Sequence, residues 1–176
     1  MKKTLIALFS SAAILISHSV FADLYIGGAI GDADYNNDLT DNSLSLVIGY
    51  DVSDFVAIEF SYVDAGSATG PLPLFDDEIT ANTSTVATSV VFEKSITDQL
   101  SVIANVGLHV WEVDVTTNFN GTNSVNGTDL TYGVGSEFHI TDGISALVKW
   151  QRYAVELYGE SEEIEDVSVG VRININ

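Results

Sequence analysis

Residues 131–153 read TYGVGSEFHITDGISALVKWQRY, and their order of apolar and polar side chains is the clearest structural signal in the chain. Apolar side chains recur at every second position, separated by small, polar or charged residues such as Gly133, Gly135 and Glu137. A short Asp-Gly turn at residues 141–143 interrupts the alternation, which then resumes. A period of two residues is typical of a β-strand with two unlike faces, so the stretch predicts a β-hairpin with one apolar face. The apolar positions are Leu130, Tyr132, Val134, Phe138, Ile140, Ile144, Ala146, Val148 and Trp150.

The same alternation recurs along the chain, and no segment shows a helical period. Connections after the second, fourth and sixth predicted strands are short, whereas the others are longer and acidic, reaching about 20 residues after the third. Pro71 and Pro73 are predicted to fall between strands, where they cost no ladder hydrogen bonds. The predicted strands lie near residues 23–32, 43–51, 55–64, 85–95, 100–114, 129–140, 144–155 and 165–175.

The two faces of these strands differ in composition. One face carries no charge, whereas the other is rich in glycine and small residues and holds a few charged side chains. A cation on a lipid-facing strand costs about 2–4 kcal/mol, and small residues suit the cramped interior of a narrow barrel. The sequence therefore predicts an all-β fold, an eight-stranded antiparallel up-and-down transmembrane β-barrel with short periplasmic turns and long extracellular loops. The alternative is a soluble sandwich or lipocalin-like barrel, in which the apolar face would turn inward.

Aromatic residues gather towards the strand ends, which is typical of girdles at the two membrane interfaces. Trp111 departs from this pattern, because its position in the alternation points inward. It either fills the interior or is turned outward by a bulge. The residues predicted to meet the lipid interfaces are Tyr50, Phe55, Tyr62, Phe92, Tyr132, Phe138, Trp150 and Tyr153.

The N-terminus has the pattern of a secretory signal peptide: Lys2 and Lys3, an apolar run, and small residues before Asp23. We expect residues 1–22 to be a signal peptide and residues 23–176 to be one outer-membrane barrel domain. The chain has 25 acidic and six basic residues, which excludes the basic patch that nucleic-acid binding requires. It has no cysteine, and no later apolar run is long enough for a transmembrane helix.

Four segments together resemble the OmpA-like small outer-membrane barrels: YGVGSEFHITDGISALVKWQRY, LSLVIGYDVSDFVAIEFSYVDAG, DLYIGGAIGD and DVSVGVRINI. The resemblance covers residues 23–176 and implies an eight-stranded barrel in a Gram-negative outer membrane. Larger family members carry a peptidoglycan-binding domain after the last strand, which is not expected here. The final strand of family members usually ends in an aromatic residue, whereas this one ends in Ile175-Asn176, which puts the usual assembly route in question.

Five charged residues fall on the inward side of the alternation: Glu59, Glu93, Glu137, Lys149 and Arg172. In the related barrels such charges form a buried ion network that closes the pore. We expect Glu59 and Glu137 to pair with Lys149 and Arg172, with Glu93 nearer the short turns. The network is either a static plug or the gate of a narrow ion path.

Motifs of catalysis and metal binding are weak. His109 and His139 point inward, but no nucleophile motif or metal-ligand spacing surrounds them, so we expect neither an enzyme nor a cofactor. Asp32, Asp34 and Asn36 match the start of a calcium loop, which then lacks its glycine and its final glutamate. Weak divalent binding, bridging the acidic loops to lipopolysaccharide phosphates, is the functional interpretation, and solvated loop charge is the simpler one.

These observations favour a monomeric barrel in the outer membrane, surrounded by lipids and lipopolysaccharide. Its predicted role is structural or interactional: envelope integrity, adhesion, or recognition of an extracellular ligand through acidic loops. A narrow, low-conductance porin-like channel is the alternative, and a soluble periplasmic ligand-binding barrel is a third.

Overall fold

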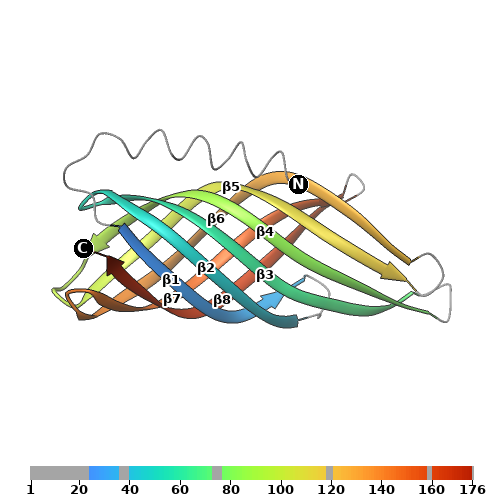
Figure 1. The fold of residues 1–176 in the computed structure, drawn as a ribbon, viewed down its shortest axis with the longest axis horizontal. Coiled ribbons are helices and arrows are strands. Elements are labelled where there is room, and N and C mark those ends of the chain that lie inside the picture. The colour runs from blue at the N-terminus through green and yellow to red at the C-terminus, as the bar shows by residue number, and fades with distance from the viewer. Residues whose placement is uncertain (1–23, 36–39, 73–76, 118–120, 158–159, 176) are drawn as a thin grey trace.

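The computed structural model describes residues 24–35, 40–72, 77–117, 121–157 and 160–175. They form eight strands in one closed barrel, in which each strand is antiparallel to the strand before it and β1 closes the ring against β8 (Figure 1). The up-and-down barrel predicted from the sequence is thus confirmed. The strands are β1 (Leu24–Asp34), β2 (Thr40–Ser53), β3 (Val56–Leu72), β4 (Asp77–Ser95), β5 (Leu100–Thr117), β6 (Gly121–Thr141), β7 (Ile144–Leu157) and β8 (Glu160–Ile175).

The apolar face of the alternation points out of the barrel. Leu46, Val134 and Val169 expose 57%, 54% and 53% of their surface. Such an outer surface would be unstable in water, so the soluble interpretation is wrong and the transmembrane one holds. No helix of the described residues is long and apolar enough to cross a membrane. The predicted signal peptide, residues 1–22, lies outside the described residues.

Every strand is longer than predicted, and β3, β4 and β6 gain the most residues. β3 continues to Leu72 and β4 begins at Asp77, inside the segment predicted as a loop of about 20 residues. A register shift between Asp64 and Ser67, with Gly66 at a φ of 78°, separates this extension from the rest of β3. The prediction failed because the extension consists of small and polar residues, which leave no apolar alternation to read.

Pro71 also departs from its prediction, because it lies within β3, opposite Glu78 of β4. The pairing of β3 with β2 ends at Leu44 and Asp64, so at Pro71 the other side of β3 is an edge. An edge strand tolerates proline because no ladder hydrogen bond is lost there. Pro73 lies outside the described residues.

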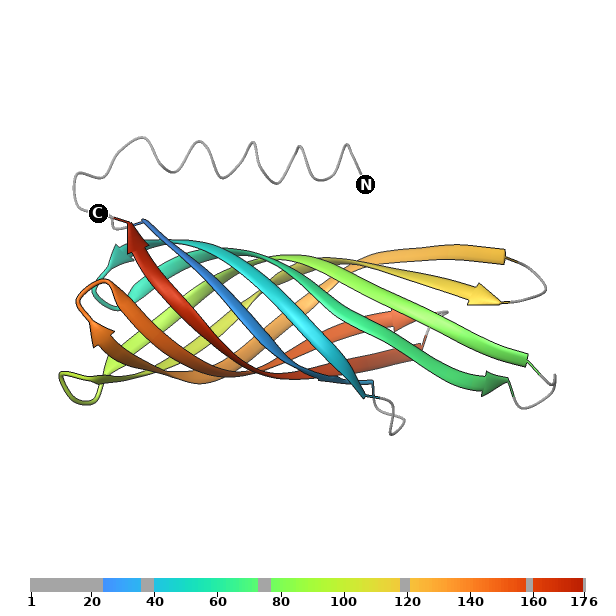
Figure 2. The same cartoon turned by 60° about the horizontal axis from the view of Figure 1, so that its bottom comes forward.

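The extensions of β3, β4, β5 and β6 form a protruding sheet, residues 65–72, 77–85, 111–117 and 121–130. Pairing within it continues to Leu72–Asp77, Ile79–Thr117 and Thr117–Gly121. By contrast, the pairing of β6 with β7 ends at Thr131 and Tyr153. The hairpins β3–β4 and β5–β6 therefore reach well beyond β1–β2 and β7–β8, as both views show (Figures 1 and 2).

The polarity of the two faces reverses near the start of the protruding sheet. Along β5, the apolar Leu108 faces outward and the polar His109 faces inward. Further along the strand, the apolar Trp111 and Val113 are buried inside, and Glu112 between them is on the outer side. The strands β1, β3, β7 and β8 reverse in the same way, with Ala33, Val63, Val155 and Ile164 buried inside and acidic or polar residues outside. Hydrocarbon favours an apolar exterior, whereas water favours an apolar interior. We call the outward residues before this reversal the apolar belt; they lie on segments 24–30, 44–50, 56–62, 86–92, 102–110, 130–140, 144–150 and 167–175.

The barrel interior is packed in layers. A lower apolar cluster, on the side of the short turns, consists of Tyr25, Ala57, Val91 and Ile103, with Val47 and Leu147 packed against it. An upper apolar cluster, at the start of the protruding sheet, consists of Ala33, Val63, Ala65, Trp111, Val113, Tyr153, Val155 and Ile164. Polar and charged side chains lie below the lower cluster and between the two clusters.

Candidate functional site

Arg172 on β8 is the centre of a charged cluster at the short-turn end of the interior. Its Nη2 lies 2.6 Å from Oδ2 of Asp51, and its Nη1 lies 3.3 Å from an oxygen of both Glu93 and Glu137. Its Nε donates to Oδ1 of Asn174 at 3.1 Å. Glu137 is almost completely buried, with 2% of its surface exposed. One guanidinium thus neutralises part of the charge of three carboxylates, and removing it would leave them facing one another.

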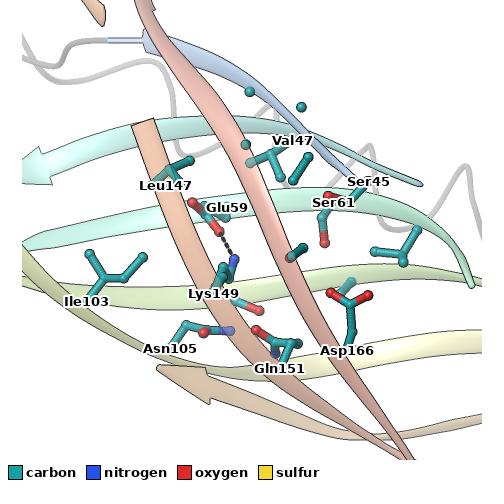
Figure 3. Close-up of a pocket in the computed structure, with 18 of the residues that line it drawn as sticks. Ser45, Val47, Glu59, Ser61, Ile103, Asn105, Leu147, Lys149, Gln151 and Asp166 are labelled. Carbon is teal, nitrogen blue, oxygen red and sulfur yellow. Dashed lines mark hydrogen bonds and ion pairs between the residues drawn. The ribbon is translucent and has the colours of Figure 1, made fainter. Parts of the chain in front are cut away.

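Tyr25 on β1 links this cluster to the middle of the barrel. The guanidinium carbon of Arg172 lies 3.7 Å from the centroid of the Tyr25 ring. The Tyr25 hydroxyl donates to Oε1 of Glu59 at 3.0 Å, and Oε2 of Glu59 lies 3.4 Å from Nζ of Lys149 (Figure 3). The ring rests on Gly49, where any Cβ would collide with it. The five charged residues predicted to point inward therefore all take part in one chain of contacts through Tyr25.

Two partners in this chain were not predicted from the sequence. Asp51 stands at the end of β2, where it reads as a solvent-exposed turn residue, and its partner Arg172 is 121 residues away. Tyr25 falls on the inward side of the β1 alternation next to Leu24 and Ile26, and this position is the signal that could have identified it.

His139 is held at the same end. Its Nε2 lies 3.0 Å from Oγ of Ser101, and its Nδ1 lies 3.0 Å from Oγ of Ser145 and 3.6 Å from Oε1 of Glu137. Serine, histidine and glutamate thus meet, but Ser101 exposes none of its surface and cannot reach a substrate. The contacts hold the imidazole in place rather than activate a nucleophile.

His109 is buried in the upper half of the interior. Its Nε2 lies 2.8 Å from the carbonyl oxygen of Ala154, which can only accept, so Nε2 carries the proton. Its Nδ1 lies 2.8 Å from Oγ1 of Thr85, and its ring packs edge-on against Tyr153. These contacts fix one tautomer of His109 and give it a packing role.

Trp111 belongs to the interior, which settles the two alternatives that the sequence left open. Only 1% of its surface is exposed, and its indole N–H donates to Oδ2 of Asp129 at 2.7 Å. The ring covers Gly127 on β6, where a side chain would strike it. Trp111 thus closes the upper part of the interior with an apolar ring rather than with ions.

Tyr153 was predicted at the lipid interface, and this prediction is wrong. The alternation places it inward with Lys149 and Gln151, and only 8% of its surface is exposed. Trp150 and Tyr132 form an outward aromatic pair, with ring centroids 6.1 Å apart. Tyr50 is half-buried. The remaining predicted interface residues, Phe55, Tyr62, Phe92 and Phe138, are exposed on the outside.

The acidic residues at the protruding end are mostly exposed. Asp32 and Asp34 lie on the outer side of β1, while Asn36, the third residue of the calcium-like pattern, lies outside the described residues. Within the described segments, no group of three or more His, Cys, Asp or Glu side chains could hold a metal ion. Asp41 instead accepts hydrogen bonds from the backbone N–H groups of Ser67, at 2.6 Å, and Asn42, at 2.8 Å.

Two groups at this end, beyond the apolar belt, have shifted pKa values. The backbone N–H of Ser67, with that of Asn42, lowers the pKa of Asp41 because these bonds favour its charged form. Burial raises the pKa of Tyr35 to about 12. The Tyr35 hydroxyl donates to the carbonyl oxygen of Ala65 at 2.7 Å, which ties the end of β1 to the extension of β3.

An apolar outer belt, an ion cluster at one end and a filled interior define a small transmembrane β-barrel of the outer-membrane type. The model of the outer membrane protein β-barrel domain family matches residues 4–174, and the chain belongs to this family. The resemblance to OmpA-like small outer-membrane barrels is thereby confirmed, and with it the placement among outer-membrane proteins. A search of curated protein sequences finds no match.

Solved structures of other barrels share the fold at low sequence identity. Neisserial surface protein A is 10% identical, with a TM-score of 0.68 over 88% of this chain and 97% of its own. The N-terminal barrel of OprF from Pseudomonas aeruginosa is 16% identical, with a TM-score of 0.63 over 86% and 97%. Ail, the attachment invasion locus protein of Yersinia pestis, was solved with the heparin analogue sucrose octasulfate; it is 15% identical, with a TM-score of 0.58 over 88% and 97%.

Proposed function

We propose that this protein is a closed outer-membrane barrel that is exported by its N-terminal signal peptide and presents the protruding sheet to the cell exterior as a binding surface. The observation that carries the proposal is the contrast between an interior closed by layers of side chains and a sheet that continues beyond the apolar belt. Side chains of the Arg172 cluster, the lower cluster and the upper cluster succeed one another along the interior. The surface that is available to bind a partner is therefore the outer face of the protruding sheet.

The charge of the protruding sheet limits the chemistry of its partner. No lysine or arginine occurs between Lys3 and Lys94 or between Lys94 and Lys149, so the sheet has no cationic side chain. Asp64, Glu112 and Asp114 lie on or beside it. The sulfated ligand found with Ail would be repelled here, because like charges meeting at an interface weaken binding. The favoured partner is a cationic or neutral extracellular molecule that binds without chemical conversion.

The porin-like alternative and an enzymatic role draw less support from the contacts. A water path would have to cross two clusters of buried apolar side chains and, at the short-turn end, Arg172 with the buried Glu137. Ser101 and His139 most resemble catalytic machinery, but Ser101, the would-be nucleophile of this pair, is completely buried. Envelope integrity remains compatible with the same closed barrel.

Binding to charged probes tests the proposal. The protein is inserted in one orientation into neutral phosphatidylcholine vesicles, and the binding of fluorescent decalysine and of a heparin oligosaccharide is measured. We expect decalysine to bind and heparin not to bind. The substitutions Glu112→Gln and Asp114→Asn, made together, should weaken decalysine binding several-fold and flatten its salt dependence.

The matched control removes the same number of charges from the short-turn end, through Asp54→Asn and Asp98→Asn. These turn residues lie at the opposite end of the barrel, so this variant should bind decalysine as the wild type does. Stronger binding of heparin than of decalysine, or equal losses in the two variants, would contradict the proposal.

A further inference from the structure

Between the lower and upper apolar clusters lies a cavity of about 50 Å³ with both apolar and polar side chains in its wall. Its lining includes the Glu59–Lys149 ion pair and also Asn105 on β5, Gln151 on β7 and Asp166 on β8 (Figure 3). A volume of this size holds roughly three to five water molecules, at about 10–15 Å³ each. The cavity is therefore large enough for a small hydrated ligand.

The side chain of Gln151 presents a buried oxygen without a partner. Its Nε2 donates to Oγ1 of Thr131 at 2.6 Å, and Thr131 donates its own proton to the carbonyl oxygen of Arg152 at 2.9 Å. Thr131 can therefore only accept from Gln151, which fixes the amide with its nitrogen towards Thr131. Oε1 of Gln151 has no hydrogen-bond partner among the residues that the structure describes, although only 4% of Gln151 is exposed.

Three oxygen-bearing side chains stand on one row of the sheet. Asn105 is paired with Gly133, Gly133 with Gln151, and Gln151 with Asp166. Directly opposite side chains on one face lie about 4.5–5.5 Å apart at their Cβ atoms, so Asp166 is the direct neighbour of Gln151, and Asn105 faces Gln151 across Gly133. Gly133 leaves the space between them open: Oδ1 of Asn105 would lie 2.9 Å from a Cβ at this position, and Oε1 of Gln151 closer still.

The cavity also carries one carboxylate more than it has cations. Lys149 pairs with Glu59, whereas Asp166 accepts a hydrogen bond from Ser43 and has no cationic side chain of the described residues within ion-pair distance. Asp166 exposes only 4% of its surface. A buried carboxylate without a counter-charge is costly, so this site favours an additional positive charge.

We propose that the cavity binds one small monovalent cation, Na⁺ or K⁺, through Asp166, Gln151 and Asn105. The unpartnered Gln151 oxygen and the excess charge of Asp166 point to it independently. A divalent ion is less suited, because Ca²⁺ takes six to eight oxygens, often from several carboxylates. The site belongs to the membrane-spanning part of the barrel and does not depend on what the protruding sheet binds.

The experiment measures urea unfolding of the barrel in neutral vesicles at constant ionic strength, with NaCl, KCl or N-methyl-D-glucamine chloride. The last cation is too large for the cavity. If one cation is released on unfolding, each tenfold rise in Na⁺ or K⁺ above its dissociation constant lowers the unfolding equilibrium constant about tenfold. We expect this dependence for at least one of the two small ions and none for N-methyl-D-glucamine.

Two substitutions test the ligands. Asp166→Asn removes the excess charge and Gln151→Leu removes the unpartnered oxygen, and each should abolish the dependence on Na⁺ or K⁺ while the barrel still folds. Glu163→Gln, on the outward side of the same strand, is the matched control and should respond as the wild type does. Equal responses of the wild type to all three salts, or an unchanged response of Asp166→Asn, would overturn the proposal. If the stability of the wild type did not depend on small cations and Asp166→Asn were more stable than the wild type, Asp166 would be protonated and the proposal would be overturned.

Discussion

The guanidinium carbon of Arg172 lies 3.7 Å from the centre of the Tyr25 ring, and that ring also packs against Gly49. This stack joins β8, β1 and β2 at the short-turn end of the interior. It also orients the Tyr25 hydroxyl towards Glu59, so one aromatic ring connects the two groups of charges.

Gly49→Ala tests the stack directly. The added Cβ would overlap the Tyr25 ring, so we expect the ring to shift and the free energy of unfolding to fall by about 1–3 kcal/mol. Urea unfolding in vesicles, followed by the shift in gel mobility, measures the loss. Gly28→Ala is the control, because a Cβ there meets its nearest atoms at 3.6 Å or more. Equal effects of the two changes would show that strand propensity rather than the stack is responsible.

Arg172→Met should destabilise the barrel by about 3–5 kcal/mol, because Asp51, Glu93 and Glu137 lose their shared counter-charge. The same unfolding assay measures this change. Lys94→Met provides the comparison: Lys94 is exposed and lies 5.7 Å from the Phe55 ring, a contact that contributes less than about 1 kcal/mol. A loss in Arg172→Met no larger than in Lys94→Met would disprove a stabilising role of the cluster.

Ion conductance should require loss of more than one layer of the interior. Arg172→Met leaves the upper apolar cluster in place, and Trp111→Ala leaves the lower cluster and Arg172 in place. We expect both single variants to remain closed in planar bilayers and the double variant to show small openings. Openings of the wild-type protein would restore the porin-like interpretation.

The two tryptophans should report different surroundings. Trp150 lies on the outer side beside Tyr132, whereas Trp111 is buried inside. In vesicles of lipids with brominated acyl chains, the variant Trp111→Phe, which retains Trp150, should lose fluorescence. Trp150→Phe, which retains Trp111, should keep most of its fluorescence. The reverse result would mean that the faces of the barrel are assigned wrongly.

The hydrogen bonds to Asp41 predict a local response to acid. The pKa of Asp41 is lower in the folded state than in the unfolded state. Its contribution to stability is therefore complete at pH values above the pKa of the unfolded state, and it is lost as the pH falls through the pKa of the folded state. In nanodiscs, the amide resonance of Ser67 should therefore shift with a midpoint below the usual range of aspartate. Asp41→Asn should remove this shift. A midpoint at the ordinary aspartate value would contradict the lowered pKa.

Alternation predicted the barrel and its belt because hydrocarbon imposes the same demand on every outward residue. The alternation of apolar and polar residues is weaker beyond the apolar belt, where the outward positions of β5 change from Leu108 and Val110 to Glu112 and Asp114. The upper cluster was therefore missed, although Trp111 and Val113 already carry the reversed pattern. Tyr153 was misplaced because its nearness to a strand end was given more weight than its position in the alternation.

The ion chain was only partly predictable for a different reason. The inward positions of Glu59, Glu93, Glu137, Lys149 and Arg172 follow from parity within each strand. Which carboxylate meets which cation depends on how the ring closes, since Arg172 reaches Asp51 only because β8 pairs with β1 and β1 with β2. Pairing between distant strands leaves no trace in the local pattern.

The reversal of polarity along β1, β3, β5, β7 and β8 fixes how deep the protein sits. If the barrel sank, carboxylates such as Asp64 and Glu112 would enter hydrocarbon; if it rose, Leu44, Leu108 and Leu130 would be left in water. Both displacements are unfavourable on all sides of the barrel, so the barrel has one preferred depth in the membrane. Whatever meets the protruding strands meets them at a set distance from the lipid surface.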